Sequence, residues 1–144
     1  MPRGLFESPF LPAILGIMEI RRVHASEAPR PGGHYAHAVV CNGLVFVSGQ
    51  LSIDPKTGEK RFGTIEEQTE LALGNVERIL KASGSDLEHV LKMMVYVADI
   101  RHWDAVNTVF GRVLGERRCA RTVIPTGTLH YGFLVEIDAV AATT

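Results

Sequence analysis

The chain has 144 residues, of which 46% are hydrophobic and 22% charged, and these values fit one globular domain that needs no disulfide or metal to hold its core. A formal net charge of −1 argues against a strongly basic nucleic-acid surface. The two cysteines, Cys41 and Cys119, are far apart and lack metal-ligand spacing. We therefore expect free thiols in a reducing, cytoplasmic compartment.

The first residues contain an apolar stretch, Phe10 to Met18, that is too short to cross a membrane, since a crossing takes about 20 apolar residues. Glu7 lies close before it and no small-residue cleavage site follows, which argues against a secretion signal. We expect residues 1–17 to be an N-terminal extension, either the product of an upstream start or an arm that packs on the domain. Residues 18–144 are expected to form the domain.

Alternating residues 19–23 predict a first short strand. Residues 37–41 and 44–48 also have strand character and are joined by Asn42-Gly43. This dipeptide between apolar runs is the strongest short hairpin signal, because both residues tolerate positive φ. The sequence therefore predicts a hairpin near the start of the domain.

Two helices are predicted after the hairpin. Thr64 and Glu67 have the spacing of a capping box, and Gly84 can end the helix that follows in the left-handed region. After a predicted strand at residues 91–98, apolar residues recur at helical spacing over residues 102–114.

The last two strands are expected at residues 121–126 and 133–141, and their short connecting loop suggests that they pair antiparallel. The full order predicts an α+β domain with two helices on one face of a sheet of about six strands. Three of the strands are apolar at both alternating positions, which is typical of burial on both sides. A single chain would leave those side chains in water, so we expect copies of the chain to cover them.

Three ionisable side chains are candidates for chemistry. Glu136 and Asp138 leave the same face of the last strand within the apolar segment LVEIDAVA. Burial would raise the pKa of such a carboxyl group toward the range useful for proton transfer, although a wet strand end or a basic partner would give ordinary structural carboxylates. Arg121 can bind a carboxylate ligand through two parallel hydrogen bonds or pair with an acid of its own chain.

The candidates for backbone and nucleophilic chemistry are weaker. Ser48-Gly49 ends a strand, and glycine lets a ligand approach backbone N–H groups that stabilise an oxyanion. No Gly-x-Ser-x-Gly motif is present, which argues against a nucleophilic serine. Cys119 lies among arginines that would lower its pKa, but no base partner for it is evident.

Many segments in fixed order resemble the Rid (YjgF) family of reactive-intermediate deaminases, also known as the L-PSP endoribonuclease family, from Met18 onward. They are APRPGGHYAHAV, GLVFVSGQLSIDPKTGE, EEQTELALGNVERIL, VLKMMVYVADI, AVNTVF, ARTV and VEIDAVA. The resemblance implies a chorismate-mutase-like fold that assembles as a homotrimeric barrel with ligand clefts between subunits. It also implies hydrolysis of enamines and imines, such as 2-aminoacrylate, 2-iminopropanoate or 2-iminobutanoate, to 2-keto acids and ammonia.

By resemblance, Arg121 holds the substrate carboxylate and Glu136 handles the water and the protons. No metal or organic cofactor is implied, and the implied partners are a small imino or keto acid and further copies of the chain, without membrane or nucleic acid. The other positions that match the family's cleft are Tyr35, Ser48, Gly49 and Asn107.

The chain departs from the family pattern around this cleft, so the resemblance leaves the substrate open. Two alternatives to a small-imine deaminase follow: a deaminase of a larger catabolic intermediate such as 2-aminomuconate, and a non-catalytic trimer that binds a small carboxylate as a sensor or regulatory protein. Ribonuclease activity is also associated with the family, and the near-neutral charge ranks it third. The departures are Ala36, His37, Cys119, Val123 and the 126–132 loop.

Overall fold

The computed structural model describes residues 18–144, so the expected extension at residues 1–17 lies outside the described residues. The strands are β1 (Arg21–Val23), β2 (Ala38–Cys41), β3 (Leu44–Gln50), β4 (Val90–Val97), β5 (Ala120–Pro125) and β6 (Val135–Ala142). The two α-helices are α1 (Ile65–Ala82) and α2 (Trp103–Leu114), and short 3₁₀ turns cover Leu87–His89, Ile100–His102 and His130–Gly132. The predicted α+β class and order of elements are confirmed.

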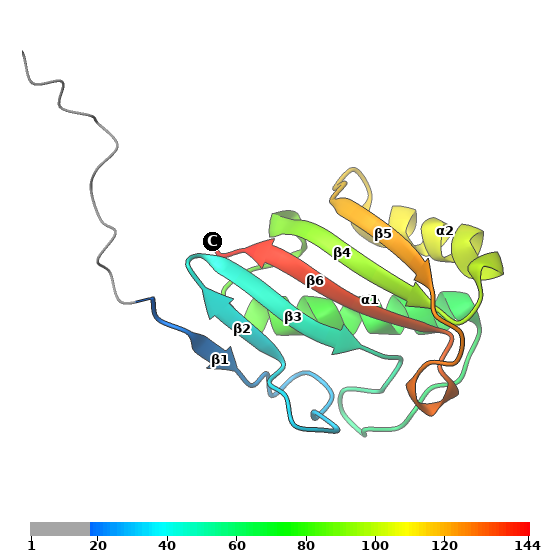
Figure 1. Ribbon diagram of the computed structural model, residues 1–144, viewed down its shortest axis with the longest axis horizontal. Coiled ribbons are helices and arrows are strands. Elements are labelled where there is room, and N and C mark those ends of the chain that lie inside the picture. Colours follow the sequence, from blue (N-terminus) through cyan, green and yellow to red (C-terminus); the bar gives the residue numbers. More distant parts are fainter. Residues whose placement is uncertain (1–17) are drawn as a thin grey trace, which may run out of the picture.

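The six strands form one sheet in the order β1-β2-β3-β6-β4-β5. Both helices pack on one face of this sheet, as predicted, and the other face is open (Figure 1). The expected antiparallel pairing of the last two strands is wrong. β5 pairs parallel with β4, and β6 lies between β3 and β4 and is antiparallel to both.

The physical reason lies in the connections. β4 and β5 are joined through α2, and a strand-helix-strand crossover returns the chain parallel to the first strand. The short loop after β5 then carries the chain past β4 to the gap beside β3. β6 therefore sits near the middle of the sheet, with Val135, Ile137, Ala139 and Ala141 buried under the helices.

Helix α1 begins where the sequence predicts. The Thr64 hydroxyl accepts from the backbone N–H of Glu67 at 3.2 Å, and the Glu67 carboxylate accepts from the backbone N–H of Thr64 at 2.7 Å. The helix ends at Ala82 and is capped by Ser83, and Gly84 follows with φ of 81°. The Asn42-Gly43 turn is likewise present, with φ of 50° and 73°. These local signals are confirmed.

The open face of the sheet carries apolar side chains. Phe46 on β3 stands opposite Val39 on β2 and Val140 on β6, and it is 47% exposed. Met94 and Tyr96 on β4 point to the same face, since they alternate with residues buried under the helices. The strands are thus apolar on both faces, as the sequence indicates, and the chain covers only one. Among residues 18–144, no helix is long and apolar enough to cross a membrane.

Candidate active site

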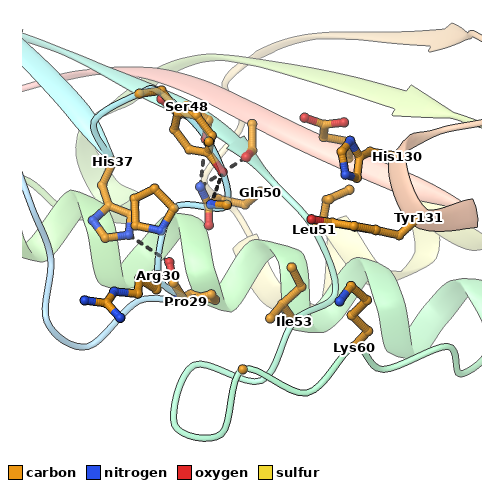
Figure 2. Close-up of a pocket in the computed structure, with 17 residues that line it drawn as sticks. Pro29, Arg30, His37, Ser48, Gln50, Leu51, Ile53, Lys60, His130 and Tyr131 are labelled. Carbon is orange, nitrogen blue, oxygen red and sulfur yellow. Dashed lines mark hydrogen bonds between the residues drawn. The ribbon is translucent and has the colours of Figure 1, made fainter.

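Four of the predicted site residues line one cavity at the end of β3. Its volume is about 590 Å³, and Tyr35, Ser48, Gly49 and Glu136 contribute to its wall (Figure 2). β3 is irregular here, because its pairing with β6 shifts register between Val47 and Gln50. The irregularity includes Gly49, whose missing side chain leaves the backbone open to close approach.

Gly49 is required by its contact with Glu136. A Cβ atom added to Gly49 would lie 3.0 Å from Cδ of Glu136 and would overlap the carboxylate oxygen Oε1. The carboxylate therefore rests directly against the backbone of β3. This is a close approach, not a requirement for left-handed backbone, since Gly49 does not have positive φ.

Glu136 is a carboxyl group of raised pKa in the cavity wall. It is half-buried, and burial, followed by the nearby charge of Asp138, raises its pKa, while His130 acts in the opposite direction. Within residues 18–144, no side chain forms a hydrogen bond or ion pair with its carboxylate. A carboxyl group with a raised pKa and an open cavity in front of it is suited to accept and donate a proton.

Asp138 lies on the same face of β6 as Glu136 but has a hydrogen-bond partner in the chain. The Tyr96 hydroxyl donates to its Oδ2 at 2.9 Å, and burial, then this carboxylate, raises the pKa of Tyr96. Asp138 does not line the cavity around Glu136. Of the two acids singled out by the sequence, the structure gives one a partner and leaves the other facing the cavity.

Ser48 and Tyr35 are held by backbone contacts. The Ser48 hydroxyl donates to the carbonyl oxygen of Ala36 at 2.7 Å, and the Tyr35 hydroxyl accepts from the backbone N–H of Gly32 at 3.1 Å. Among the described residues, no basic side chain forms a hydrogen bond with the Ser48 hydroxyl. Tyr35 is 49% exposed and lines the cavity.

The remaining predicted residues, Arg121 and Asn107, form a second cluster elsewhere. Nη2 of Arg121 donates to Oδ1 of Asn107 at 2.8 Å. The guanidinium carbon lies 4.7 Å from the ring centroid of Phe110 and 5.8 Å from that of Trp103. Both rings belong to α2 and fix the direction of the guanidinium group. Among the described residues, no carboxylate pairs with Arg121, so its charge is available to an anionic ligand.

Within one chain, Arg121 and Glu136 lie on opposite faces of the sheet. Arg121 pairs with Met93, which is fully buried under the helices. Glu136 pairs with Tyr96 on the open side, and β4 separates the two strands that carry the candidate residues. The sequence-based expectation that both act on one substrate therefore cannot be met by a single chain.

Cys119 lies near this second cluster, beside Arg117 and Arg118. Burial is the largest influence on its pKa and raises it, and this outweighs the opposite effect of Arg121. A half-buried thiol of raised pKa is a poor nucleophile. The structure thus favours the interpretation of Cys119 as an unreactive thiol.

Histidine 37 is structural. Its Nδ1 accepts from the backbone N–H of Ala25 at 2.8 Å, and its Nε2 lies 2.8 Å from the carbonyl oxygen of Pro29. Since Nδ1 accepts, Nε2 must carry the proton and donate it to Pro29, so the ring is neutral and both nitrogens are occupied. His37 therefore shapes the cavity without reacting in it.

Several side chains of the cavity wall have no role assigned from the sequence, and Lys60, His130 and Tyr131 are among them. His130 and Tyr131 belong to the 126–132 loop, which the sequence marks only as a departure from the family pattern. Lys60 lies in a loop whose path depends on contacts with residues far along the chain, so no local pattern marks it.

Comparison with known proteins identifies close similarities over the same region. Residues 25–143 match the family described as endoribonuclease L-PSP. A RutC family protein of Pyrococcus horikoshii is 37% identical over 119 residues, which cover 83% of this chain and 94% of that protein. The human 2-iminobutanoate/2-iminopropanoate deaminase is 36% identical over 123 residues, which cover 85% of this chain and 90% of that protein.

The fold is also shared with solved structures. Escherichia coli TdcF with bound serine matches with a TM-score of 0.81 and 28% sequence identity. The match covers 86% of this chain and 99% of that one. The similarity therefore spans the whole domain and not one motif.

Proposed function

The chain belongs to the endoribonuclease L-PSP family, also called the Rid family, and on this premise we propose that it hydrolyses enamines and imines of amino acids to 2-keto acids and ammonia. Curated relatives at about this level of similarity are named imine deaminases. The observation that carries the proposal is the setting of Glu136. It is a half-buried carboxyl group of raised pKa, unpaired among the described residues, that faces a cavity.

The reaction needs an anchor for the substrate carboxylate and a group that moves protons. Arg121 supplies the anchor, since its guanidinium group can form two parallel hydrogen bonds with a carboxylate. The contacts with Asn107 and Phe110 hold that group in place, so less rotamer freedom is lost on binding. That E. coli TdcF binds serine, an amino acid, is in keeping with this assignment.

Glu136 moves protons throughout the proposed sequence. With an enamine, its protonated form donates to the β-carbon and gives the iminium ion, the form in which an imine substrate also reacts. The carboxylate then takes a proton from water as the oxygen attacks the iminium carbon, which gives a neutral carbinolamine and restores protonated Glu136. Glu136 donates this proton to the carbinolamine nitrogen, ammonia leaves as the carbonyl forms, and the hydroxyl proton returns to Glu136, so that enamine and water are converted to keto acid and ammonia. The proposed hydrolysis requires two things of the protein: a fixed position for the substrate and a group that transfers protons.

We extend the proposal to a homotrimer with sites between subunits. Because Arg121 and Glu136 lie on opposite faces of one sheet, a common substrate requires Arg121 from one chain and Glu136 from another. The open face with Phe46, Met94 and Tyr96 is the surface that association would cover. Burying such a surface stabilises association by about 25 cal/mol per Å² before the cost of association is subtracted.

The test is a panel of freshly generated imines from different amino acids, with spontaneous hydrolysis subtracted. The wild-type protein should accelerate keto-acid and ammonia release, and Arg121→Ala should lower kcat/KM by about 100-fold or more, as loss of a charged, doubly hydrogen-bonded anchor predicts. Arg112→Ala, which removes an exposed arginine paired with Glu70, is the matched control. Failure of the wild-type protein to accelerate any imine would refute the proposal.

A further inference from the structure

One wall of the Glu136 cavity is built by Lys60, His130 and Tyr131. Nζ of Lys60 lies 4.4 Å from the centroid of the Tyr131 ring, and the His130 and Tyr131 rings are 3.7 Å apart in an edge-to-face arrangement. Figure 2 shows the Lys60 side chain reaching the Tyr131 ring, with His130 next to it. The three side chains therefore form a single packed unit.

The backbone at Tyr131 is strained in order to place this ring. Tyr131 has φ of 58°, and the only other non-glycine residue of the described chain with positive φ is Asn42. Asn42 lies in a hairpin turn that favours such a conformation, whereas an aromatic residue pays a steric penalty there. Strain of this kind is commonly retained at ligand sites, because surrounding contacts enforce it.

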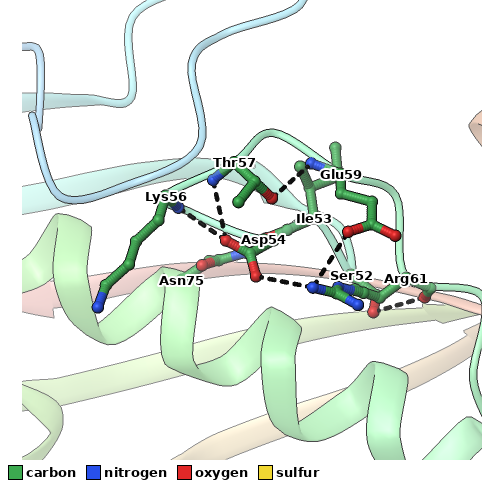
Figure 3. Close-up of polar contacts among 8 residues, drawn as sticks. All are labelled: Ser52, Ile53, Asp54, Lys56, Thr57, Glu59, Arg61 and Asn75. Atoms are coloured by element: carbon green, nitrogen blue, oxygen red, sulfur yellow. Dashed lines mark hydrogen bonds and ion pairs between the residues drawn. The ribbon is translucent and has the colours of Figure 1, made fainter.

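Polar contacts among the neighbours of Lys60 hold the loop that carries it (Figure 3). Lys60 forms an isolated bridge with Ile53, and its neighbours are also fixed: the backbone N–H of Arg61 donates to Ser52 at 2.9 Å, and the carbonyl of Glu59 accepts from Asp54 at 2.8 Å. The loop is therefore a short, closed hairpin whose position at Lys60 is set by backbone contacts.

Two further contacts tie this hairpin together. The amide of Asn75 on α1 donates to the carbonyls of Leu51 at 3.1 Å and Ile53 at 2.9 Å. At its tip, the Asp54 carboxylate accepts from the backbone N–H groups of Lys56 and Thr57, and these contacts lower the pKa of Asp54 to about 2. The base of Lys60 is thus anchored to a helix, while its ammonium group reaches the cavity.

The charges around the cavity are asymmetric. Glu136 is its one acidic lining residue, whereas Arg30 and Lys60 are basic, and within residues 18–144 no carboxylate forms an ion pair with Lys60. His37 has both ring nitrogens engaged, so it offers no donor to a ligand. The cavity of about 590 Å³ in one chain falls in the range of small-molecule sites.

We propose that Lys60, supported by Tyr131, binds a second carboxylate at the far end of the substrate, so that the enzyme prefers imines of amino dicarboxylic acids. The inference rests on the proposed deaminase function and names its substrate class. The ammonium group would form a charge-assisted hydrogen bond with the distal carboxylate, and the Tyr131 ring would keep it from turning into solvent. Glu136 and Arg121 would keep their roles at the reacting end.

The test compares imines generated in place from glutamate and from norvaline, which have chains of the same length with and without the distal carboxylate. The wild-type protein should favour the glutamate imine in kcat/KM by about 10- to 100-fold, the effect of one charge-assisted hydrogen bond. In Lys60→Met, the ratio of the two kcat/KM values should fall to about one, and Lys60→Arg should keep most of the wild-type preference. Lys56→Met, in the same loop but outside the cavity lining, should leave the ratio unchanged.

Equal kcat/KM for the two imines in the wild-type protein, or an equal loss of both in Lys60→Met, would overturn the inference. Measuring the binding of the corresponding keto acids tests the Lys60 subsite independently of the deaminase activity. If neither imine is turned over, but 2-oxoglutarate binds more tightly than 2-oxopentanoate in a Lys60-dependent way, the deaminase proposal fails and the carboxylate subsite stands. Equal binding of both keto acids would reject the subsite.

Discussion

The cavity of Glu136 and the cluster of Arg121 differ in how their surroundings affect the charged form of the side chain. Around Glu136, burial and Asp138 disfavour the ionised carboxyl group and raise its pKa. Around Arg121, an amide and two aromatic rings orient a permanent cation and leave it unneutralised among the described residues. One region is prepared to exchange a proton and the other to hold an anion, and the sheet places them on opposite faces. Under the proposed mechanism, association of chains must bring the two regions to one substrate.

The largest effect should come from removing the proton-exchanging group. Glu136→Gln keeps the shape of the side chain but cannot titrate, so kcat should fall by about 10²- to 10⁴-fold, the usual contribution of a general acid or base. Substrate binding through Arg121 should change far less. Steady-state kinetics on the same imine panel would check this, and a variant with unchanged kcat would remove Glu136 from the chemistry.

Association can be broken without touching either region. Phe46→Glu places a charge on the open face beside Val39 and Val140, and a buried, unpaired carboxylate disfavours the interface strongly. The variant should sediment as a smaller species and lose most of its activity. A dissociated chain that kept full activity would contradict the division of the site between subunits.

A substitution at Gly49, which lies against Glu136, should have an intermediate effect on kcat. In Gly49→Ala, the new Cβ would displace the carboxylate, and we expect kcat to fall by about 10- to 100-fold, as for a misplaced catalytic group. Gly74→Ala in α1 is the matched control, because its Cβ would meet only the end of the Arg78 side chain. Equal activity of both variants would show that the position of Glu136 is not critical.

The smallest effect concerns stability and pH. Because the pKa of Glu136 is raised in the folded chain, the folded state holds this proton more tightly than the unfolded state, and the stability contributed by the group falls as pH rises through the folded pKa. Glu136→Gln should therefore raise the melting temperature at pH 7, and the gain should shrink below the ordinary glutamate pKa of 4.5. Thermal unfolding at both pH values checks the sign, and a gain that did not depend on pH would contradict it.

The sequence alone predicts the features that depend on residues close together in the chain. The Thr64 capping box, the Asn42-Gly43 turn and the one-sided covering by helices depend on short-range patterns, and each is present. The pairing of the last strands is different. The short loop between β5 and β6 suggests that these two strands pair, but the crossover through α2 places β5 parallel to β4 instead.

The candidate site divides in the same way. Glu136 and Arg121 could be singled out by their residue types, but their placement on opposite faces follows from the strand order, which the sequence does not reveal. Lys60 and Tyr131 approach each other through a long-range loop contact and a strained backbone, neither of which leaves a local pattern. What the sequence misses is therefore tertiary in origin.

The most direct test of the central claim mixes two inactive chains. Arg121→Ala retains Glu136 and Glu136→Gln retains Arg121, so subunits exchanged in equal amounts should form some sites with both residues intact. If each site takes the two residues from different chains at random, activity should return to about one quarter of the wild-type value. If both residues of a site come from one chain, no mixture regains activity, and that result would contradict the account.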